Sequence, residues 1–175
     1  GMNYLTSNKD FFFEGEKATF QTQINLENSF LRMAETLQQP VIIVCDRGTM
    51  DISTYLTPDF WHRIISEAGY TDAQLRDRYD AVLHLVSAAD GAEQFYTTAN
   101  NAQRLEKADE EGLKIARELD KKIVSAWKGH PHLRVINNHE DFNNKLNRVL
   151  KEISNVLAIP QPIEEERKYI VKLTG

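Results

Sequence analysis

The sequence predicts an α/β fold, a doubly wound layer in which short parallel strands alternate with helices. Three short apolar runs supply the strands, Val41–Cys45, Ala81–Ser87 and Leu133–Ile136. Stretches with the apolar period of a helix precede, separate and follow these runs. Because strands joined through helices form parallel crossovers of one hand, we expect one parallel sheet with helices on both faces.

The first element is a predicted helix from Glu16 to Gln38, which Pro40 ends. Spacings of three, four and seven place its apolar residues in two adjacent stripes, which predicts burial over a wide arc. The stripes are Phe20, Ile24, Leu31 and Ala34, and Leu26, Phe30, Met33 and Leu37. The strand Val41–Cys45 follows. It is apolar and rich in β-branched residues, so we expect it to be buried on both faces, with Cys45 inert.

The middle of the chain carries clear helix boundaries. Thr57 and Pro58 are suited to the N-cap and first position of a helix that runs to about Ala68, and Gly69 is suited to its C-cap. Thr71 or Asp72 caps a further short helix that ends near Asp77. The second strand then runs from Ala81 to Ser87.

The last third predicts a helix, a strand and a helix. The first helix, Glu110–Trp127, has an inward face made of Leu113, Ala116, Leu119, Ile123 and Trp127. The second helix begins after Asn138 or Asp141 and runs to Leu157. Pro160 and Pro162 mark a linker. We therefore expect one domain over 1–158, followed by a linker and a strand-like run over 159–175.

Composition narrows the functional classes. The chain has 175 residues, a net charge of −5 and 27% charged residues, which is ordinary for a soluble globular protein. A single cysteine excludes an internal disulfide scaffold. There is no apolar run of the ~18–20 residues that span a bilayer, and no secretory leader pattern, so we expect a cytoplasmic protein. The acidic balance argues against general nucleic-acid binding.

The end of the first strand carries the best candidate for chemistry. Parallel sheets bind ligands at the carboxyl ends of their strands, and Asp46, Arg47 and Gly48 follow Cys45 there. A carboxylate at a strand tip can bind Mg²⁺ beside phosphate oxygens, and the adjacent arginine can bind the phosphate. A surface ion pair is the alternative. Asp51 either orients Arg47 or caps the turn.

The stretch from Ala88 to Asp109 is long for a connection inside a domain. It contains Arg104, and Arg117 lies beyond it. A mobile segment with arginines is typical of the lids of phosphoryl-transfer enzymes, although a polar surface helix has the same composition. His84 and His130 have no metal-ligand spacing around them and are expected in the core rim and in a turn. The chain contains no Gly-x-x-x-x-Gly-Lys-Ser/Thr phosphate loop.

Three stretches carry a family resemblance: VIIVCDRGTMD (Val41–Asp51), YDAVLHLVSAADGAEQFY (Tyr79–Tyr96) and AWKGHPHLRVINN (Ala126–Asn138). They resemble the AAA-like P-loop ATPase domain of the TRPL translocation defect protein and its bacterial relatives, from about Leu5 to Leu157. The resemblance implies a kinase-like three-layer P-loop NTPase that binds ATP or GTP with Mg²⁺.

In that family the Asp-Arg-Gly segment closes a Walker-B-like strand. The resemblance therefore implies a catalytic role for Asp46 and Arg47, with Asp46 binding Mg²⁺ through water or acting as a base. Arg104 and Arg117 are the implied phosphate-binding arginines. The resemblance leaves open whether the nucleotide is ATP or GTP. It also leaves open which molecule accepts the phosphoryl group, and whether the reaction is transfer or hydrolysis.

Some relatives continue into a CYTH domain, a barrel that binds triphosphate. The first strand of that barrel bears Glu-x-Glu-x-Lys, and Glu164, Glu166 and Lys168 match this spacing. Alternate residues of a strand face one side, so the three side chains would line one wall. The resemblance thus implies a second triphosphate site in the stub of a CYTH domain. A charged surface tail is the alternative.

The sequence also departs from this family, because the first strand and its Gly-rich loop are missing before residue 1. In the family's sheet that strand lies between Val41–Cys45 and Ala81–Ser87. Either the chain is part of a longer protein, or it is a truncated relative, or the flanking strands close up, or a second copy completes the sheet. We therefore expect a phosphoryl-transfer enzyme when the loop is supplied. The alternative is a non-catalytic dimeric scaffold. A third interpretation is a kinase-like domain whose anion site lies at the Asp46–Thr49 turn.

Overall fold

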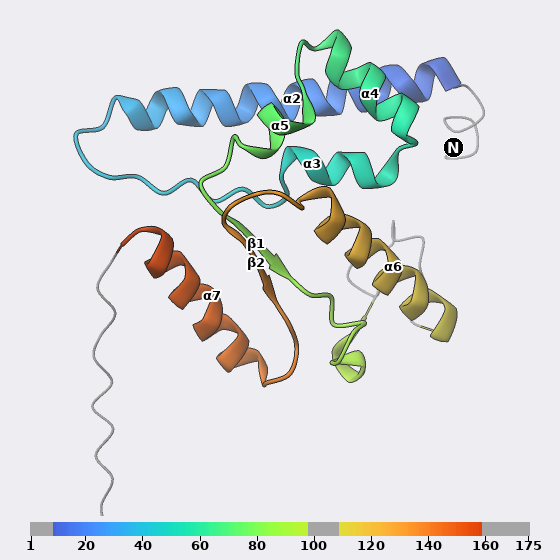
Figure 1. Cartoon of the computed structure of the whole chain (residues 1–175), viewed down its shortest axis with the longest axis vertical. Helices are drawn as coiled ribbons and strands as arrows, with labels where there is room; N and C mark the ends of the chain where they lie inside the picture. Colours follow the sequence, from blue (N-terminus) through green and yellow to red (C-terminus); the bar gives the residue numbers. More distant parts are fainter. Residues whose placement is uncertain (1–8, 98–108, 159–175) are drawn as a thin grey trace, which may run out of the picture.

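The computed structural model describes residues 9–97 and 109–158. They form an α/β arrangement in which a small sheet lies below a layer of helices (Figure 1). The helical layer comes from residues 9–76, and the sheet with its two flanking helices comes from residues 82–156. Its elements are α2 (Lys9–Glu35), α3 (Thr49–Ile52), the 3-10 turn η1 (Ser53–Tyr55), α4 (Pro58–Glu67) and α5 (Asp72–Arg76).

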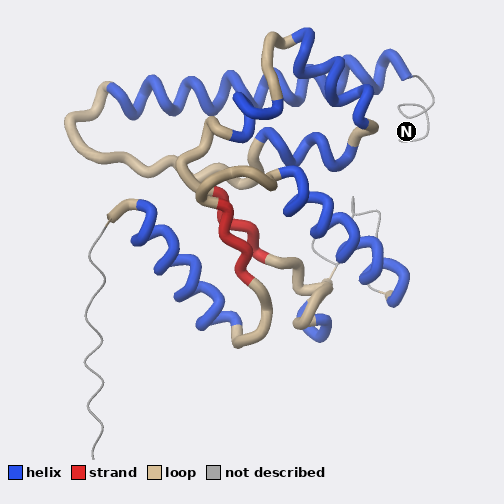
Figure 2. Tube along the Cα trace, in the orientation of Figure 1, coloured by secondary structure: helices blue, strands red, loops and turns tan. Residues whose placement is uncertain are grey.

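The sheet has two parallel strands, β1 (Val82–Leu85) and β2 (Leu133–Ile136). Val82 pairs with Leu133 and Leu85 with Ile136. The helices α6 (Glu110–Ala126) and α7 (Phe142–Val156) lie on opposite sides of this pair (Figure 2). A short 3-10 turn, η2 (Glu93–Phe95), follows β1. The parallel pairing across a long helical connection confirms the predicted α/β class.

The prediction of a buried strand at Val41–Cys45 is wrong. In the structure this segment is extended but pairs with neither described strand, and it runs beside the C-terminal half of α2 (Figure 1). Val44 is 83% exposed, and Cys45 is exposed as well. A strand requires a neighbour that accepts and donates its backbone hydrogen bonds, and the described parts of the chain place none beside it. Apolar composition alone therefore did not form the strand.

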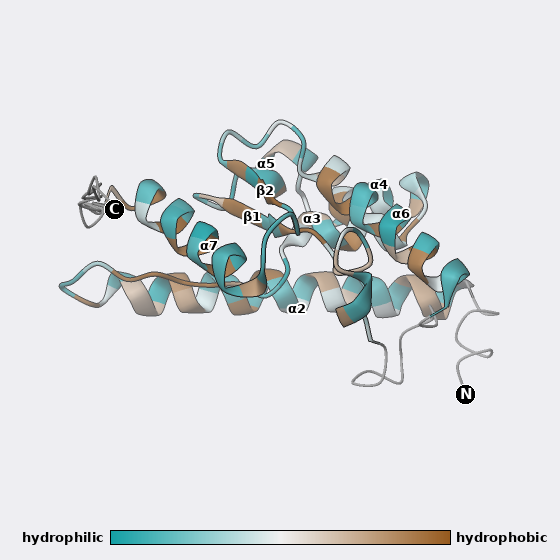
Figure 3. Cartoon of the chain, turned by 90° about the horizontal axis from the view of Figure 1, so that it is seen from below, coloured by the Kyte–Doolittle hydropathy of each residue, from teal (hydrophilic) through white to brown (hydrophobic). Residues whose placement is uncertain are grey.

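Helix α2 begins seven residues earlier than Glu16, because Phe13 continues the stripe of Phe20 at a spacing of seven. Phe13, Phe20 and Ile24 are fully buried, whereas the second stripe is exposed. Figure 3 shows that the C-terminal half of α2 extends past α3 and α4, and that the segment after the helix runs back alongside it. The expectation of burial over a wide arc is therefore wrong, because α2 buries a single narrow stripe and the adjacent one is exposed.

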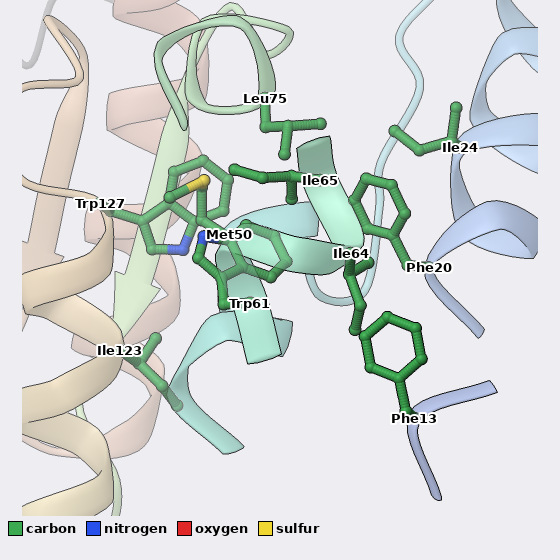
Figure 4. Close-up of a cluster of buried hydrophobic side chains, with 10 residues drawn as sticks. All are labelled: Phe13, Phe20, Ile24, Met50, Trp61, Ile64, Ile65, Leu75, Ile123 and Trp127. Carbon is green, nitrogen blue, oxygen red and sulfur yellow. The ribbon is translucent and has the colours of Figure 1, made fainter. Parts of the chain in front are cut away.

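The hydrophobic core lies between the helices rather than on the sheet (Figure 4). Phe20 meets the Trp61 ring edge-to-face at 5.8 Å between centroids, an arrangement that aromatic pairs favour. Each such buried side chain contributes about 1.5–3 kcal/mol relative to exposure. The buried cluster is Phe13, Phe20, Ile24, Met50, Trp61, Ile64, Ile65, Leu75, Ile123 and Trp127. It joins α2, α4 and α5 to the C-terminal end of α6, and it thereby positions the start of the sheet.

The helix caps explain why the remaining boundaries were predictable. Thr71 and Gln74 form a reciprocal capping box on α5. The side chains of Asp109 and Asp141 accept hydrogen bonds from backbone N–H groups in the first turns of α6 and α7. Asp141, and not Asn138, is therefore the cap of α7. Gly69 ends α4 with a φ of +78°, the left-handed conformation that glycine adopts most easily.

Candidate functional site

Two groups of polar residues are candidates for function. The first, which we call the carboxyl edge, comprises residues 86–90 after β1, Asn137 and Asn138 after β2, and the α6 and α7 side chains that face them. The second, the DRG turn, is Asp46–Gly48. The carboxyl edge is the place where parallel sheets bind ligands.

Asn138 ties the two loops of the carboxyl edge together. Its amide nitrogen donates to the carbonyl oxygens of Ser87 at 2.8 Å and Asp90 at 2.7 Å. The ammonium group of Lys145, on α7, donates to the Val86 carbonyl at 2.8 Å and to the Asn138 side-chain oxygen at 2.5 Å. Lys145 is buried, and burial lowers its pKa. This network holds the ends of β1 and β2 together, and it places the ammonium group of Lys145 next to them.

An acid–imidazole pair lies on the other side of the same edge. Asp120 Oδ2 of α6 is 3.1 Å from His84 Nε2 of β1, and Asp120 Oδ1 accepts from the Ser87 N–H at 2.9 Å. Both side chains are largely buried. Burial alone would raise the pKa of Asp120, but the His84 ring and the Ser87 N–H outweigh it and hold that pKa below its ordinary value. His84 thus lies at the core rim as predicted.

Arg117 is the one predicted phosphate arginine that the structure describes. Its Nε donates to the Ala89 carbonyl at 2.5 Å, and its Nη2 pairs with Glu93 at 2.9 Å. These contacts place the guanidinium directly beside the loop that follows β1, and the Arg117 side chain as a whole is 36% exposed. A shallow surface pocket of about 400 Å³ also includes Arg117, together with Glu110, Glu111 and Lys114. Arg117 is therefore positioned at the carboxyl edge with part of its charge facing solvent.

The DRG turn is tied to the protein core through Gly48. A Cβ at this position would lie 2.5 Å from a ring carbon of Trp127, so any side chain larger than that of glycine would clash with the indole ring. Its φ of −117° is open to other residues. Arg47 has a φ of +78°, and the side chains of Asp46 and Arg47 are exposed.

Asp51 caps this turn, which decides between its two predicted roles. Its carboxylate accepts from the Gly48 N–H at 3.2 Å and from Trp127 Nε1 at 2.7 Å. The Thr49 N–H donates to the Tyr79 hydroxyl at 2.8 Å. The backbone N–H groups of Gly48 and Thr49 are thus bonded within the protein, and an anion at the Asp46–Thr49 turn would have to use other donors, such as the exposed Arg47 side chain.

Sequence reasoning missed a buried carboxylate next to this turn. Glu27 of α2 accepts from the Tyr79 hydroxyl at 2.9 Å and from Gln23 at 3.0 Å, and it pairs with Arg78 at 3.2 Å. Burial raises the pKa of Tyr79 well above its ordinary value. The available signal was the position of Glu27, three residues after Ile24 on the buried face of the helix.

The structure places the DRG turn and Arg117 at opposite ends of β1. Gly48 packs beside Tyr79, which precedes β1, and beside Trp127, which precedes the parallel strand β2, whereas Arg117 binds the loop after β1. Arg117 lies ten positions before Trp127, the C-cap of α6, which is about 15 Å along the helix. Asp46 and Arg47 are therefore not brought together with Arg117. Arg104, Glu164, Glu166 and Lys168 lie outside the described residues.

The donor set limits how a metal ion can bind. Among residues 9–97 and 109–158 no cluster of three or more His, Cys, Asp or Glu side chains is suited to holding one. Asp46 is a single exposed carboxylate, which fits an Mg²⁺ ion carried mainly by nucleotide phosphates and water. His130 is used structurally, with its Nε2 2.7 Å from the Tyr79 carbonyl oxygen.

Within the described parts of the chain, no helix has the length and apolarity that a membrane crossing requires.

Comparisons with known proteins identify the family. No curated protein and no solved structure matches the chain significantly. A family model described as an AAA domain matches residues 4–145. Because that match covers most of the chain, the protein belongs to the AAA domain family and is an AAA-like domain of the P-loop NTPase type.

Proposed function

We propose that this chain is the core of a domain that binds ATP or GTP with Mg²⁺ and supports phosphoryl transfer or hydrolysis once a phosphate-binding loop is supplied. The family match over residues 4–145 is the observation that carries the proposal. The carboxyl edge supports it, because a cationic side chain is held there beside a loop at the strand ends.

In this proposal Arg117 neutralises phosphate charge, and Asp46 and Arg47 act on the Mg²⁺ ion and the transferred group. Arg104 would be a second phosphate-binding residue. The separation of the DRG turn from Arg117 then requires the two parts to approach one another when nucleotide binds, as lids do in phosphoryl-transfer enzymes. The triphosphate role of Glu164, Glu166 and Lys168 remains a separate proposal.

Titration of the chain with MgATP and MgGTP tests this function, with binding followed by amide chemical shifts. Without a loop of backbone donors we expect dissociation constants of about 1–10 mM, which corresponds to roughly 3–4 kcal/mol. Shifts should cluster at residues 86–90, and Arg117→Gln should weaken binding about fivefold or more. The matched control is Arg63→Gln, since Arg63 also pairs with a glutamate, Glu67, on an exposed helix surface. Absence of shifts at 20 mM of either nucleotide, or equal weakening by the control, would refute the proposal.

A second candidate function is a non-catalytic interaction scaffold. One observation favours it, the exposed apolar surface of α2 and of the segment that follows it. Contiguous apolar surface of this kind marks interaction sites in soluble proteins.

A further inference from the structure

The C-terminal half of α2 and the turn after it carry a row of large apolar side chains that the rest of the described structure does not cover. We call this row the α2 seam; it comprises Leu26, Phe30 and Met33 of α2 and Leu37, two residues after the helix ends. Its members are about half exposed, from 48% for Phe30 to 63% for Met33. Leaving such side chains in water forgoes the stabilisation that burial gives a helix, and helices depend mainly on that packing.

A groove runs between the α2 seam and the segment Val41–Val44. Its volume is about 680 Å³. Val41, Ile42 and Val44 are exposed along it, so apolar side chains line both walls. Figure 3 shows the hydrophobic colour of this segment continuing beside α2. The seam and the segment therefore form one surface.

The spacing within the α2 seam selects a helix as its partner. Steps of four, three and four residues average about 3.7, close to the 3.6 residues per turn of a helix, so the row is one continuous apolar stripe of the kind that pairs with another helix. An extended peptide would match a two-residue period instead.

The charge of the surface favours a second copy as the source of that helix. The chain carries a net charge of −5, so two copies repel one another overall unless the surfaces that meet are nearly neutral. The groove includes only three charged residues: Glu27 is paired with Arg78, and Asp46 and Arg47 are adjacent and opposite in sign. The uncharged side chains of Gln23, Ala34 and Thr36 complete much of the remaining lining. A two-fold interface sets a surface against itself, and this one can do so without repulsion between like charges.

The area is also sufficient. The seven apolar side chains of the α2 seam and the segment expose roughly 400–500 Å² per chain, when a full side chain is taken as about 120 Å². A standard interface buries about 800 Å² of each partner, a little over half of it apolar.

We propose that the α2 seam is the interface at which two copies of this chain pair. The two α2 helices run antiparallel about a two-fold axis between Phe30 and Met33. In this register Leu26 of each copy faces Leu37 of the other, and Phe30 faces Met33. The proposal does not depend on nucleotide binding.

Sedimentation of the full chain between about 1 and 200 μM tests the pairing, with a dimer expected in the micromolar range. Leu26→Lys and Leu37→Glu should each raise the dimer dissociation constant about thirtyfold, as the loss of a central interface residue does. Mixing these two variants should restore a dimer. The introduced lysine of one variant then faces the introduced glutamate of the other, and the unchanged Leu37 of the first faces the unchanged Leu26 of the second. Circular dichroism shows whether each variant keeps its fold.

The control is Leu150→Lys on α7, since Leu150 is 61% exposed and lies on a different helix. It should leave the dimer unchanged. A strict monomer at 200 μM overturns the proposal, as does a dimer that Leu26→Lys leaves intact. Loss of the dimer only in the Leu150 control would place the interface on α7 and also overturn it. Failure of the mixed variants to recover would reject the antiparallel register.

Discussion

Replacing Gly48 by alanine tests whether this glycine serves the packing of the core. The added Cβ would lie 2.5 and 2.7 Å from two ring carbons of Trp127 and 3.2 Å from Tyr79 Cζ. Carbon atoms attract one another best near 3.5–4.0 Å, so the indole must move by about 1 Å. Trp127 is 2% exposed and donates to Asp51, so it has little freedom to move. Overpacking of this kind costs about 1–3 kcal/mol.

The backbone contributes nothing to this cost, because the φ of Gly48 is −117°. Urea unfolding, followed by tryptophan fluorescence, measures the loss in the free energy of unfolding. In a separate thermal melt, the melting temperature should fall by roughly 3–10 °C. Gly15→Ala is the matched control. Gly15 lies inside α2 with open space around its Cβ position, so the same substitution should stabilise by about 0.5–1 kcal/mol.

A double-mutant cycle isolates the contact. In a Trp127→Leu background the two clashing ring carbons are gone, and the cost of Gly48→Ala should fall by at least about 1 kcal/mol. If Gly48→Ala leaves stability unchanged in the wild type, or costs the same in both backgrounds, the packing argument is wrong. Glycine would then be required for another reason, such as close approach of a phosphate.

Three further predictions concern titratable groups. Asp120→Asn removes the charge beside His84 and should cost about 1–2 kcal/mol at pH 7. The pKa of Asp120 is lower in the folded state than in the unfolded chain. The extra stability of the wild type over the variant is therefore complete above about pH 4 and is lost as the pH falls through the folded-state pKa. Urea titrations of both proteins at pH 7 and pH 3 measure this difference. Glu27→Gln leaves the largely buried Arg78 without its charge partner and should cost about 2–4 kcal/mol by chemical denaturation, whereas a loss below about 0.5 kcal/mol would contradict the pairing. Cys45 is exposed, yet burial of its sulfur and the nearby Glu27 raise its pKa, so iodoacetamide should modify it more slowly at pH 7.5 than it modifies the unfolded chain, as mass spectrometry can follow.

The elements that local signals define were predictable from the sequence. Pro58, the Thr71 capping box and Gly69 act within a few residues of the helices they begin or end, and the structure places those boundaries where they were expected. The strand Leu133–Ile136 was predicted to the residue. Its neighbour supplies the backbone partners that an apolar run requires.

Elements that depend on distant neighbours were not predictable in the same way. Val41–Cys45 has a more strand-like composition than β2, yet it forms no strand, since no described strand lies beside it. The apolar period of α2 revealed two stripes but could not show that only one of them meets α4 and α3. In both cases the missing information is which other part of the chain lies opposite.

The candidate site divides along the same line. The sequence by itself determined the family, the α/β class, and the presence of polar residues after each predicted strand. Only the tertiary structure decided that Asp51 caps a turn against Trp127, that Glu27 pairs with Arg78, and that the DRG turn and Arg117 lie at opposite ends of β1. The physical reason is that hydrogen bonds and ion pairs between residues far apart in the chain leave no periodic trace in a sequence, whereas helix caps and apolar stripes do.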